Sequence, residues 1–262
     1  MSGANWDFSG RTALVTGAAG GIGEAIVRRF AAARANVVFS DRKEDDGRAL
    51  ERELRGMGVD ARFFVSDATD EAAVEALVAA ALAVTGRLDI AVNNVGGIAR
   101  AQGDSSAARI HDTDLSAWRA TQDLNLTSCF LGMKHQIGAM MAAGEGAIVN
   151  LTSLAGMRWS EFAGPSYTAA KAGVIQLTKY AAIAYAGSGI RVNVVAPGLT
   201  ATRTLLSSIP DEESRAIRAK RVPIGRMIDP SETADACLWA CSAAASGVTG
   251  LVIPVDGGAA AL

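Results

Sequence analysis

Tyr167 and Lys171 are separated by three residues in a Tyr-x-x-x-Lys segment. On a helix, this spacing places a phenol and an ammonium group on the same face. A free tyrosine has a pKa of about 10 and is a poor base at neutral pH, but a nearby cation favours the phenolate. The pair can therefore perform general acid–base chemistry, although in isolation such a pair is more often a surface feature.

Two other polar side chains strengthen the catalytic interpretation. Ser153 ends a predicted strand, where its hydroxyl can share a crevice with Tyr167 and hydrogen-bond a substrate oxygen. Asn125 lies in the middle of a predicted helix, where an amide has a mediocre helix propensity. We expect Asn125 to have a special role there, such as holding a water molecule or bending the helix.

A glycine-rich turn follows the first predicted strand and leads into a helix: Thr16-Gly17-Ala18-Ala19-Gly20-Gly21-Ile22-Gly23. Gly17 permits the tight turn, whereas Gly21 and Gly23 allow a pyrophosphate to approach the backbone at a helix N-terminus. The spacing differs from Gly-x-Gly-x-x-Gly, and alone it also fits a merely flexible turn. With the flanking strand and helix, it predicts a dinucleotide site.

Asp41 follows the second predicted strand, 18 residues after Gly23. A carboxylate at this position can accept hydrogen bonds from the adenosine ribose and would repel a 2′-phosphate, which favours NAD over NADP. An ordinary helix-capping aspartate is the alternative. Arg42 leaves the choice open, because a guanidinium can pair with a 2′-phosphate.

Other candidate cofactor contacts follow the third and fourth predicted strands. Asp67 and Ala68 come after the third strand, and Asn94 and Gly96 belong to the Asn-Asn-Val-Gly segment that closes the fourth. Asp67 is expected to bind the adenine amino group, and Gly96 to allow close backbone contact. Helix capping and turn formation are the alternatives.

The elements that must position these groups alternate between short apolar strands and longer Ala-rich helices. This pattern predicts βαβ units and a doubly wound parallel α/β sheet. We expect strands at 12–15, 36–40, 62–66, 89–93, 147–152, 191–196 and 251–255, and helices at 23–33, 45–57, 71–84, 115–143, 166–186 and 230–244. Two irregular stretches, 96–112 and 198–229, follow predicted strands and are candidate substrate loops.

Composition narrows the class of protein. The 262 residues fit one domain spanning 1–262, and the formal net charge of −2 gives no general attraction to nucleic acid or an acidic membrane. No signal peptide or apolar run of about 18 residues is evident, so we expect a cytoplasmic protein. The three cysteines, Cys129, Cys237 and Cys241, are expected to be buried packing residues. A zinc site at His111 or His135 would need distant partners that the sequence does not indicate, so no metal is predicted.

Taken together, these motifs resemble the short-chain dehydrogenase/reductase family from about residue 10 to residue 258. The resemblance is carried, in family order, by Thr16-Gly-x-x-x-Gly-x-Gly23, Asn93-Asn94-x-Gly96, Asn125, Ser153, Tyr167-x-x-x-Lys171, Pro197-Gly198 and Asp256-Gly257-Gly258. Two departures are Val95, where alanine is usual, and an interval from Ser153 to Tyr167 that is one residue longer than the commonest pattern. Neither removes a catalytic group.

The resemblance implies specific roles for these residues. Tyr167 would be the general acid/base, Ser153 would orient the substrate oxygen, and Asn125 would hold a relay water. Lys171 would lower the Tyr167 pKa and bind the nicotinamide ribose. The remaining implied cofactor contacts are Gly17, Gly21, Ile22 and Gly23 at the pyrophosphate, Asp41 and Asp67 at the adenosine, Asn94 and Gly96 in the cleft, and Pro197, Gly198, Thr200 and Thr202 near the nicotinamide.

The implied enzyme transfers a hydride between NAD(H) and a secondary alcohol or its ketone, and is a homotetramer or homodimer with a seven-stranded sheet. An apolar pocket favouring a cyclic or hydrophobic substrate is expected if the loops fold inward. Its expected members are Trp159, Phe162, Ile98, Leu199, Leu205 and Leu206. The alternative is that these residues simply pack against one another. The alternatives are a 3-oxoacyl thioester reductase that uses NADPH and the basic segment 215–221, and a non-catalytic dinucleotide-sensing protein. That basic segment also fits a solvated helix face.

Overall fold

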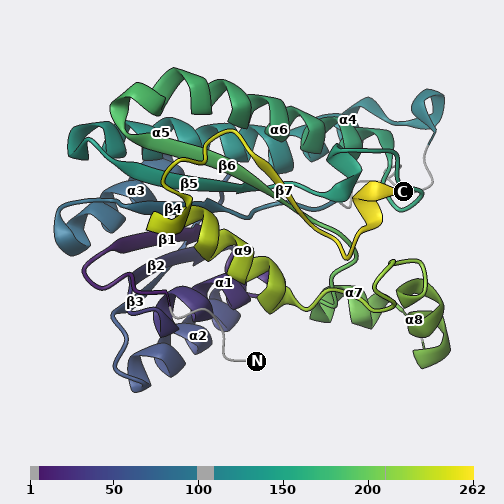
Figure 1. Cartoon of the computed structure of the whole chain (residues 1–262), viewed down its shortest axis with the longest axis horizontal. Helices are drawn as coiled ribbons and strands as arrows, with labels where there is room; N and C mark the ends of the chain where they lie inside the picture. Colours follow the sequence, from purple (N-terminus) through teal and green to yellow (C-terminus); the bar gives the residue numbers. More distant parts are fainter. Residues whose placement is uncertain (1–5, 99–108, 210) are drawn as a thin grey trace.

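Seven parallel strands form the central sheet (Figure 1). The computed structural model describes residues 6–98, 109–209 and 211–262. The strand order is β3-β2-β1-β4-β5-β6-β7, and it reverses between β1 and β4, where a crevice opens outside the carboxyl ends of the strands. The predicted fold and all seven predicted strands are confirmed: β1 (Thr12–Thr16), β2 (Asn36–Asp41), β3 (Ala61–Val65), β4 (Ile90–Asn93), β5 (Gly146–Leu151), β6 (Ile190–Pro197) and β7 (Val252–Val255).

Helices cover both faces of this sheet (Figure 1). One layer contains α1 (Gly21–Ala32), α2 (Glu44–Gly56) and α9 (Pro230–Cys241), and the other contains α3 (Glu71–Thr85), α5 (Ser128–Ala143) and α6 (Pro165–Tyr185). Successive strand side chains point to opposite layers, so Val15 packs in the first core and Leu14 in the second. Every residue of β1 is buried, as a parallel sheet covered on both sides requires.

The predicted helix 115–143 is not continuous. It divides into α4 (Leu115–Gln122), a π-helical turn at Asp123–Thr127 and α5. Asn125 lies within that turn, and its side chain donates to the carbonyl of Thr121, four residues earlier. A side chain that bonds to the preceding turn competes with the regular helical hydrogen bonds. This bond therefore favours a π-turn at Asn125 over a continuous α-helix.

The stretch 198–229 is more regular than predicted. It contains α7 (Arg203–Ser208) and α8 (Glu212–Ala219), each of which begins at a capping side chain. Thr202 accepts a hydrogen bond from the Leu205 amide, and Asp211 accepts one from the Ser214 amide. Most of the other expected irregular stretch, 96–112, lies outside the described residues, and Ile110–Asp112 forms a short 3₁₀ turn.

A buried amide network joins the strands below the crevice to the helices of one layer. The Asn93 amide donates to Gln136 and to Asn150, both at 2.9 Å. Asn150 donates in turn to the Thr178 hydroxyl at 2.8 Å. Since buried amides are costly unless paired, this network fixes β4 and β5 against α5 and α6.

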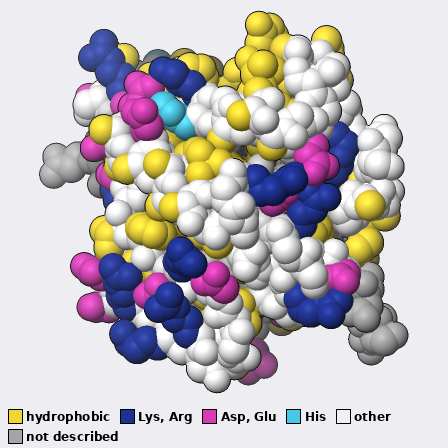
Figure 2. Space-filling model, turned by 90° about the vertical axis from the view of Figure 1, so that its left-hand side faces the viewer, with side chains coloured by type: hydrophobic (Ala, Val, Ile, Leu, Met, Phe, Trp, Pro, Cys, Tyr) yellow, Lys and Arg dark blue, Asp and Glu magenta, His cyan; other side chains and the backbone are white. Residues whose placement is uncertain are grey.

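Charges on the surface are mixed in sign. In the view of Figure 2, basic and acidic side chains lie beside one another, and hydrophobic side chains gather at the top, where α5 and α6 lie in Figure 1. In the described ranges, no helix is both long and apolar enough to cross a bilayer. The prediction of buried cysteines is confirmed, because all three thiols are free and buried. The described part of the chain holds no group of three or more His, Cys, Asp or Glu side chains suited to a metal ion.

Candidate active site

Ser153, Tyr167 and Lys171 meet at the carboxyl ends of the central strands. Ser153 follows β5, and the other two lie early in α6, which starts at Pro165 with a preset helical φ. The Lys171 Nζ lies 5.6 Å from the centre of the Tyr167 ring and donates a 3.1 Å hydrogen bond to the Leu151 carbonyl. The structure thus places the phenol and the ammonium on one helix face.

Burial sets the protonation behaviour of this pair. It raises the pKa of Tyr167, and hydrogen bonding with Ser153 acts in the opposite direction. Burial lowers the pKa of Lys171 to about 8, since its side chain is almost wholly removed from solvent. The lowering of the Tyr167 pKa expected from Lys171 is not seen here, where burial dominates and the ammonium donates to Leu151. That effect stays a prediction.

Asn125 connects the π-turn to the end of β4. Its Nδ2 donates to the Gly97 carbonyl at 2.7 Å and to the Thr121 carbonyl at 2.9 Å, while its Oδ1 accepts from the Gly97 amide at 3.0 Å. Both amide hydrogens are therefore used. On this side chain, the second lone pair of Oδ1 is left for the water that the family resemblance implies.

Gly96 lies where Lys171 and Asn125 approach each other. A Cβ at Gly96 would lie 2.5 Å from Lys171 Nζ and 2.7 Å from Asn125 Oδ1. A side chain would thus displace both polar groups. The requirement for glycine here comes from close packing of the site itself as well as from the adjacent cofactor cleft.

A cavity of ≈ 410 Å³ extends from Tyr167 along the carboxyl ends of the strands. The glycine-rich turn forms one wall, with Gly17 and Gly21 at positive φ, where a side chain would be strained. The Asn94 amide donates to the Gly17 carbonyl at 2.7 Å and anchors this turn to the end of β4. The last residue of β2, the residues that follow it and the residues after β3 form the far end of the cavity.

Asp41 and Arg42 are both engaged at that far end. The Asp41 carboxylate accepts hydrogen bonds from the Ala19 amide at 3.0 Å and from the Lys43 amide at 3.1 Å. The Arg42 guanidinium forms an ion pair with Asp67 at 3.6 Å. Asp41 therefore braces the glycine-rich turn, and Asp67 partly neutralises the cation that would attract a 2′-phosphate.

Most of the predicted cofactor residues line this cavity, but three do not. Gly23 packs α1 against the turn, because its Cβ would lie 2.2 Å from the Gly17 carbonyl oxygen. Thr200 is buried and hydrogen-bonds the Gly198 carbonyl, while Gly198 lines a neighbouring cavity instead. The predicted residues that line it are Gly17, Gly21, Ile22, Asp41, Arg42, Asp67, Ala68, Asn94, Gly96, Tyr167, Lys171, Pro197 and Thr202.

Ser66 is a lining residue that the sequence reasoning missed. Its hydroxyl is buried beside Asp67 and has no hydrogen-bond partner among the described residues. A buried hydroxyl without a partner is costly, so a bound polar group at this end of the cavity would satisfy it. Together with the glycine cradle, this orphaned donor fits an elongated dinucleotide.

A second cavity of ≈ 290 Å³ adjoins the first, and Tyr167 and Pro197 line both. Ser153 and Leu199 contribute to its wall, as do Trp159 and Phe162 from the segment before α6. The expected apolar pocket is therefore only partly right, because Ile98, Leu205 and Leu206 are not among its lining residues. Charged side chains complete the wall: Arg158, Glu161, Arg218 and Arg221.

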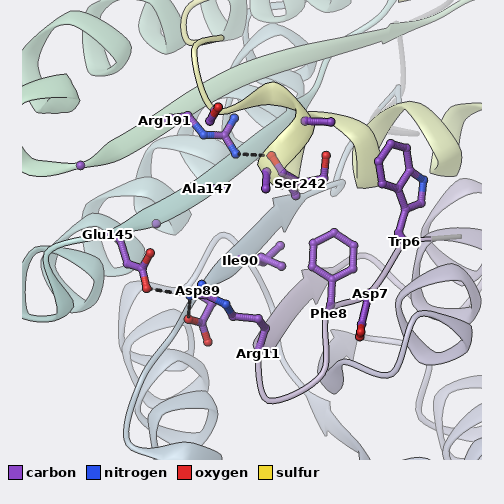
Figure 3. A pocket seen from close by; sticks show the side chains of 16 residues that line it. Trp6, Asp7, Phe8, Arg11, Asp89, Ile90, Glu145, Ala147, Arg191 and Ser242 are labelled. Carbon is purple, nitrogen blue, oxygen red and sulfur yellow. Dashed lines mark hydrogen bonds and ion pairs between the residues drawn. The ribbon is translucent and has the colours of Figure 1, made fainter. Parts of the chain in front are cut away.

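A third cavity, of ≈ 500 Å³, opens at the opposite end of the sheet (Figure 3). Arg11 lies there between Asp89 and Glu145, with which it forms ion pairs at 2.8 and 2.7 Å. Arg191 donates to the Ser242 carbonyl at 3.2 Å. None of the candidate catalytic or cofactor residues lines this cavity, so the site belongs to the carboxyl ends of the strands.

Comparison with known proteins agrees with this geometry. A family model described as enoyl-(acyl carrier protein) reductase matches residues 17–260. A cis-4-hydroxycyclohexanecarboxylate dehydrogenase of Sinomonas cyclohexanicum is 45% identical over 253 residues, which cover 96% of this chain and 97% of the relative. A solved short-chain dehydrogenase/reductase of Burkholderia xenovorans has a TM-score of 0.88 and 39% identity, covering 97% of this chain and 98% of its own.

A third similar structure carries ligands. It is a 7α-hydroxysteroid dehydrogenase complexed with NADH and 7-oxo glycochenodeoxycholic acid, with a TM-score of 0.87, 33% identity, and coverage of 97% of this chain and 96% of its own. This chain belongs to the short-chain dehydrogenase/reductase family. It is an oxidoreductase that binds a nicotinamide dinucleotide and acts on the CH–OH group of secondary alcohols.

Proposed function

We propose that this enzyme uses NAD⁺ to oxidise a secondary alcohol carried on a small ring. The observation that carries the proposal is that Tyr167 lies between two adjoining cavities, with Ser153 on one side and Lys171 on the other. The larger cavity has the glycine cradle of a dinucleotide site, and the smaller one has a partly apolar wall. A ring fits the smaller cavity, and two relatives described above act on ring alcohols.

In this proposal, each polar group has one task. Tyr167 takes the proton of the substrate hydroxyl during oxidation and returns it during reduction. Ser153 hydrogen-bonds the substrate oxygen, and Lys171 holds the ribose hydroxyls and favours the phenolate. Asn125 fixes Gly97 and presents the free lone pair of Oδ1 to a relay water. When bound, the nicotinamide supplies the carbon that accepts or donates the hydride.

The preference for NAD over NADP rests on Asp41 and Asp67. A carboxylate at the end of β2 can accept hydrogen bonds from ribose hydroxyls and repels a 2′-phosphate, while the ion pair with Asp67 occupies Arg42. Lys43 also lines this end of the cavity, so the local charge is mixed. The cellular excess of NAD⁺ over NADH would favour the direction of alcohol oxidation.

Titration of the protein with NADH and NADPH, followed by reduced-nicotinamide fluorescence, tests the cofactor assignment. We expect tighter binding of NADH, and we expect Asp41→Ala to bring the NADPH affinity closer to it, since the repulsive carboxylate is removed. Because Asp41 also braces the glycine-rich turn, Asp41→Asn is the companion variant that keeps an acceptor without the charge. Tighter binding of NADPH by the unmodified protein would contradict the assignment and point to Arg42 as the selecting residue.

We also propose that residues 1–262 act as one catalytic unit and that the enzyme is a cytoplasmic homotetramer or homodimer. Free buried thiols are typical of a reducing compartment. Apolar side chains exposed on α5 and α6 support an association surface. They are Phe130, Met141, Tyr180 and Ile183.

A further inference from the structure

Three arginines face the smaller cavity against a single carboxylate. Arg158 comes from the segment before α6, whereas Arg218 and Arg221 come from the end of α8 and the turn after it. Glu161 is the one acidic side chain in the described lining. The proton and hydride transfers described above use none of these charges, so the excess of positive charge needs its own account.

Arg218 is the only half-buried one of the three without an ion pair among the described residues. Arg221 forms an ion pair with Glu161 and also lies over the Phe162 ring, 5.6 Å from its centre. Arg218 lies 5.5 Å from the centre of the same ring and is half-buried, but no ion pair between described residues includes it. Arg158 is exposed and is likewise absent from those ion pairs.

A half-buried guanidinium beside an aromatic ring is a favourable site for a carboxylate. It is more weakly hydrated than an ammonium and can donate two parallel hydrogen bonds. Partial burial also strengthens its attraction for an anion relative to bulk water. The cavity volume of ≈ 290 Å³ is at the small end of the range for ligand pockets, which suits one ring with one substituent.

We propose that the substrate of this site carries a carboxylate, which Arg218 binds with support from Arg158. This inference rests on the proposed function, because it places the carboxylate on the alcohol that Tyr167 deprotonates. Arg218 is then a specificity-determining residue that does not touch the reacting carbon. Its position on α8 explains why a helix far along the chain contributes to the substrate pocket.

Calorimetric binding of cyclohexanecarboxylate and of cyclohexanecarboxamide, with and without NADH, tests the proposal. Neither probe has the reacting hydroxyl, so the result does not depend on catalysis. We expect the carboxylate to bind about tenfold more tightly than the amide, and Arg218→Ala to abolish that difference. Arg218→Lys should retain part of it. Lys220→Ala is the matched control, because this exposed cation near the end of α8 does not line the cavity, and it should leave the difference unchanged.

Equal binding of the two probes, absence of binding by both, or a preference that survives Arg218→Ala would overturn the proposal. So would displacement of the carboxylate by coenzyme A that depends on Arg218, since the arginines would then serve the phosphates of a thioester carrier. Oxidation of 4-hydroxycyclohexanecarboxylate, which has the ring, the hydroxyl and the anion, tests the proposed function separately. Its failure alongside selective carboxylate binding would leave the anion site intact and reject the ring-alcohol assignment.

Discussion

The buried charges at the two ends of the sheet differ in how many hydrogen-bond and ion-pair partners they have. At the amino ends, the buried Asp89 carboxylate accepts hydrogen bonds from the Arg11 and Arg87 guanidinium groups and from the Thr12 amide, at 2.6 to 2.8 Å. At the carboxyl ends, the buried Lys171 ammonium has one carbonyl acceptor, and no ion pair in the described ranges includes it. The carboxylate at the amino ends is thus fully paired, whereas the ammonium at the carboxyl ends is largely unpaired.

This difference separates groups that stabilise the fold from groups that the fold must hold in place. A buried charge with several partners contributes to stability, and its loss leaves those partners unsatisfied. A buried charge with few partners costs free energy, and such groups concentrate at functional sites. We therefore expect substitutions at the amino ends to lower stability with little effect on turnover. Substitutions at the carboxyl ends should lower turnover without loss of stability.

The largest expected effect is that of Tyr167→Phe. Loss of the phenolic hydroxyl removes the general base, so kcat should fall by about 10³-fold, while NADH binding and the unfolding midpoint stay close to those of the unmodified protein. Steady-state kinetics, fluorescence titration and thermal unfolding measure the three quantities. Turnover that persists within tenfold would exclude Tyr167 as the acid/base group. If Tyr167→Phe lost turnover but cells carrying it behaved like cells with the unmodified protein, a non-catalytic dinucleotide-sensing role would be supported.

The next effect concerns the amino ends. Asp89→Ala should lower the free energy of unfolding by about 2 to 3 kcal/mol, because the buried Thr12 amide loses its acceptor and the Arg11 and Arg87 guanidinium groups keep only Glu145. Urea unfolding measures this loss, and kcat should remain unchanged. Glu145→Gln is the control: its side chain is 48% exposed, so the change should be about 0.5 kcal/mol. Equal effects of the two variants would show that burial does not distinguish these carboxylates.

The smallest effect is a gain in stability at the catalytic end. The pKa of Lys171 in the folded protein, about 8, lies below its ordinary value of 10.5, so the unfolded chain binds more protons between these two pH values. Stability therefore rises with pH across that window, and below it the cost of burying the charge is fully present. Lys171→Met should add about 2 kcal/mol at pH 7, after allowance for the lost bond to Leu151, and nothing above pH 10.5.

Unfolding free energies of Lys171→Met between pH 6 and pH 10, with turnover measured in parallel, test this expectation. Activity should be lost although the protein is more stable. Lys179→Met, on the exposed side of the same helix, is the matched control and should change neither quantity. A loss of stability at pH 7 would mean that the ammonium is better satisfied than the single carbonyl acceptor indicates.

The sequence was sufficient for features that depend on periodicity and on neighbours along the chain. The apolar pattern located all seven strands, and the four-residue spacing placed Tyr167 and Lys171 on one helix face. The position of Asp41 at the end of a strand placed it at the cofactor cavity. In each case, the regular geometry of a strand or helix converts sequence spacing into position in space.

Features that depend on packing between distant segments were not predictable. The contact of Gly23 with a pyrophosphate stays a prediction, but the second demand for glycine there, the close approach of α1 to Gly17, could not be predicted from the sequence. Ser66 gives no sequence signal beyond its place next to Asp67, and its lack of a partner becomes evident only once the cavity is formed. From the sequence, Arg218 also fitted a solvated helix face. The residues of α8 give no sign that the helix packs with Arg218 over the Phe162 ring.

The π-helical turn at Asp123–Thr127 makes the length of this segment as important as its side chains. A π-turn accommodates one residue more than an α-helical turn, so deletion of one residue there would allow a continuous helix to form. Because the extra residue is absorbed within the π-turn, α4 and α5 would keep nearly the same facing, but the backbone around Asn125 would lose the conformation that places its amide against Gly97. Substitutions can accumulate along this segment over evolution, but a change in the number of its residues would dismantle the site without changing any catalytic side chain.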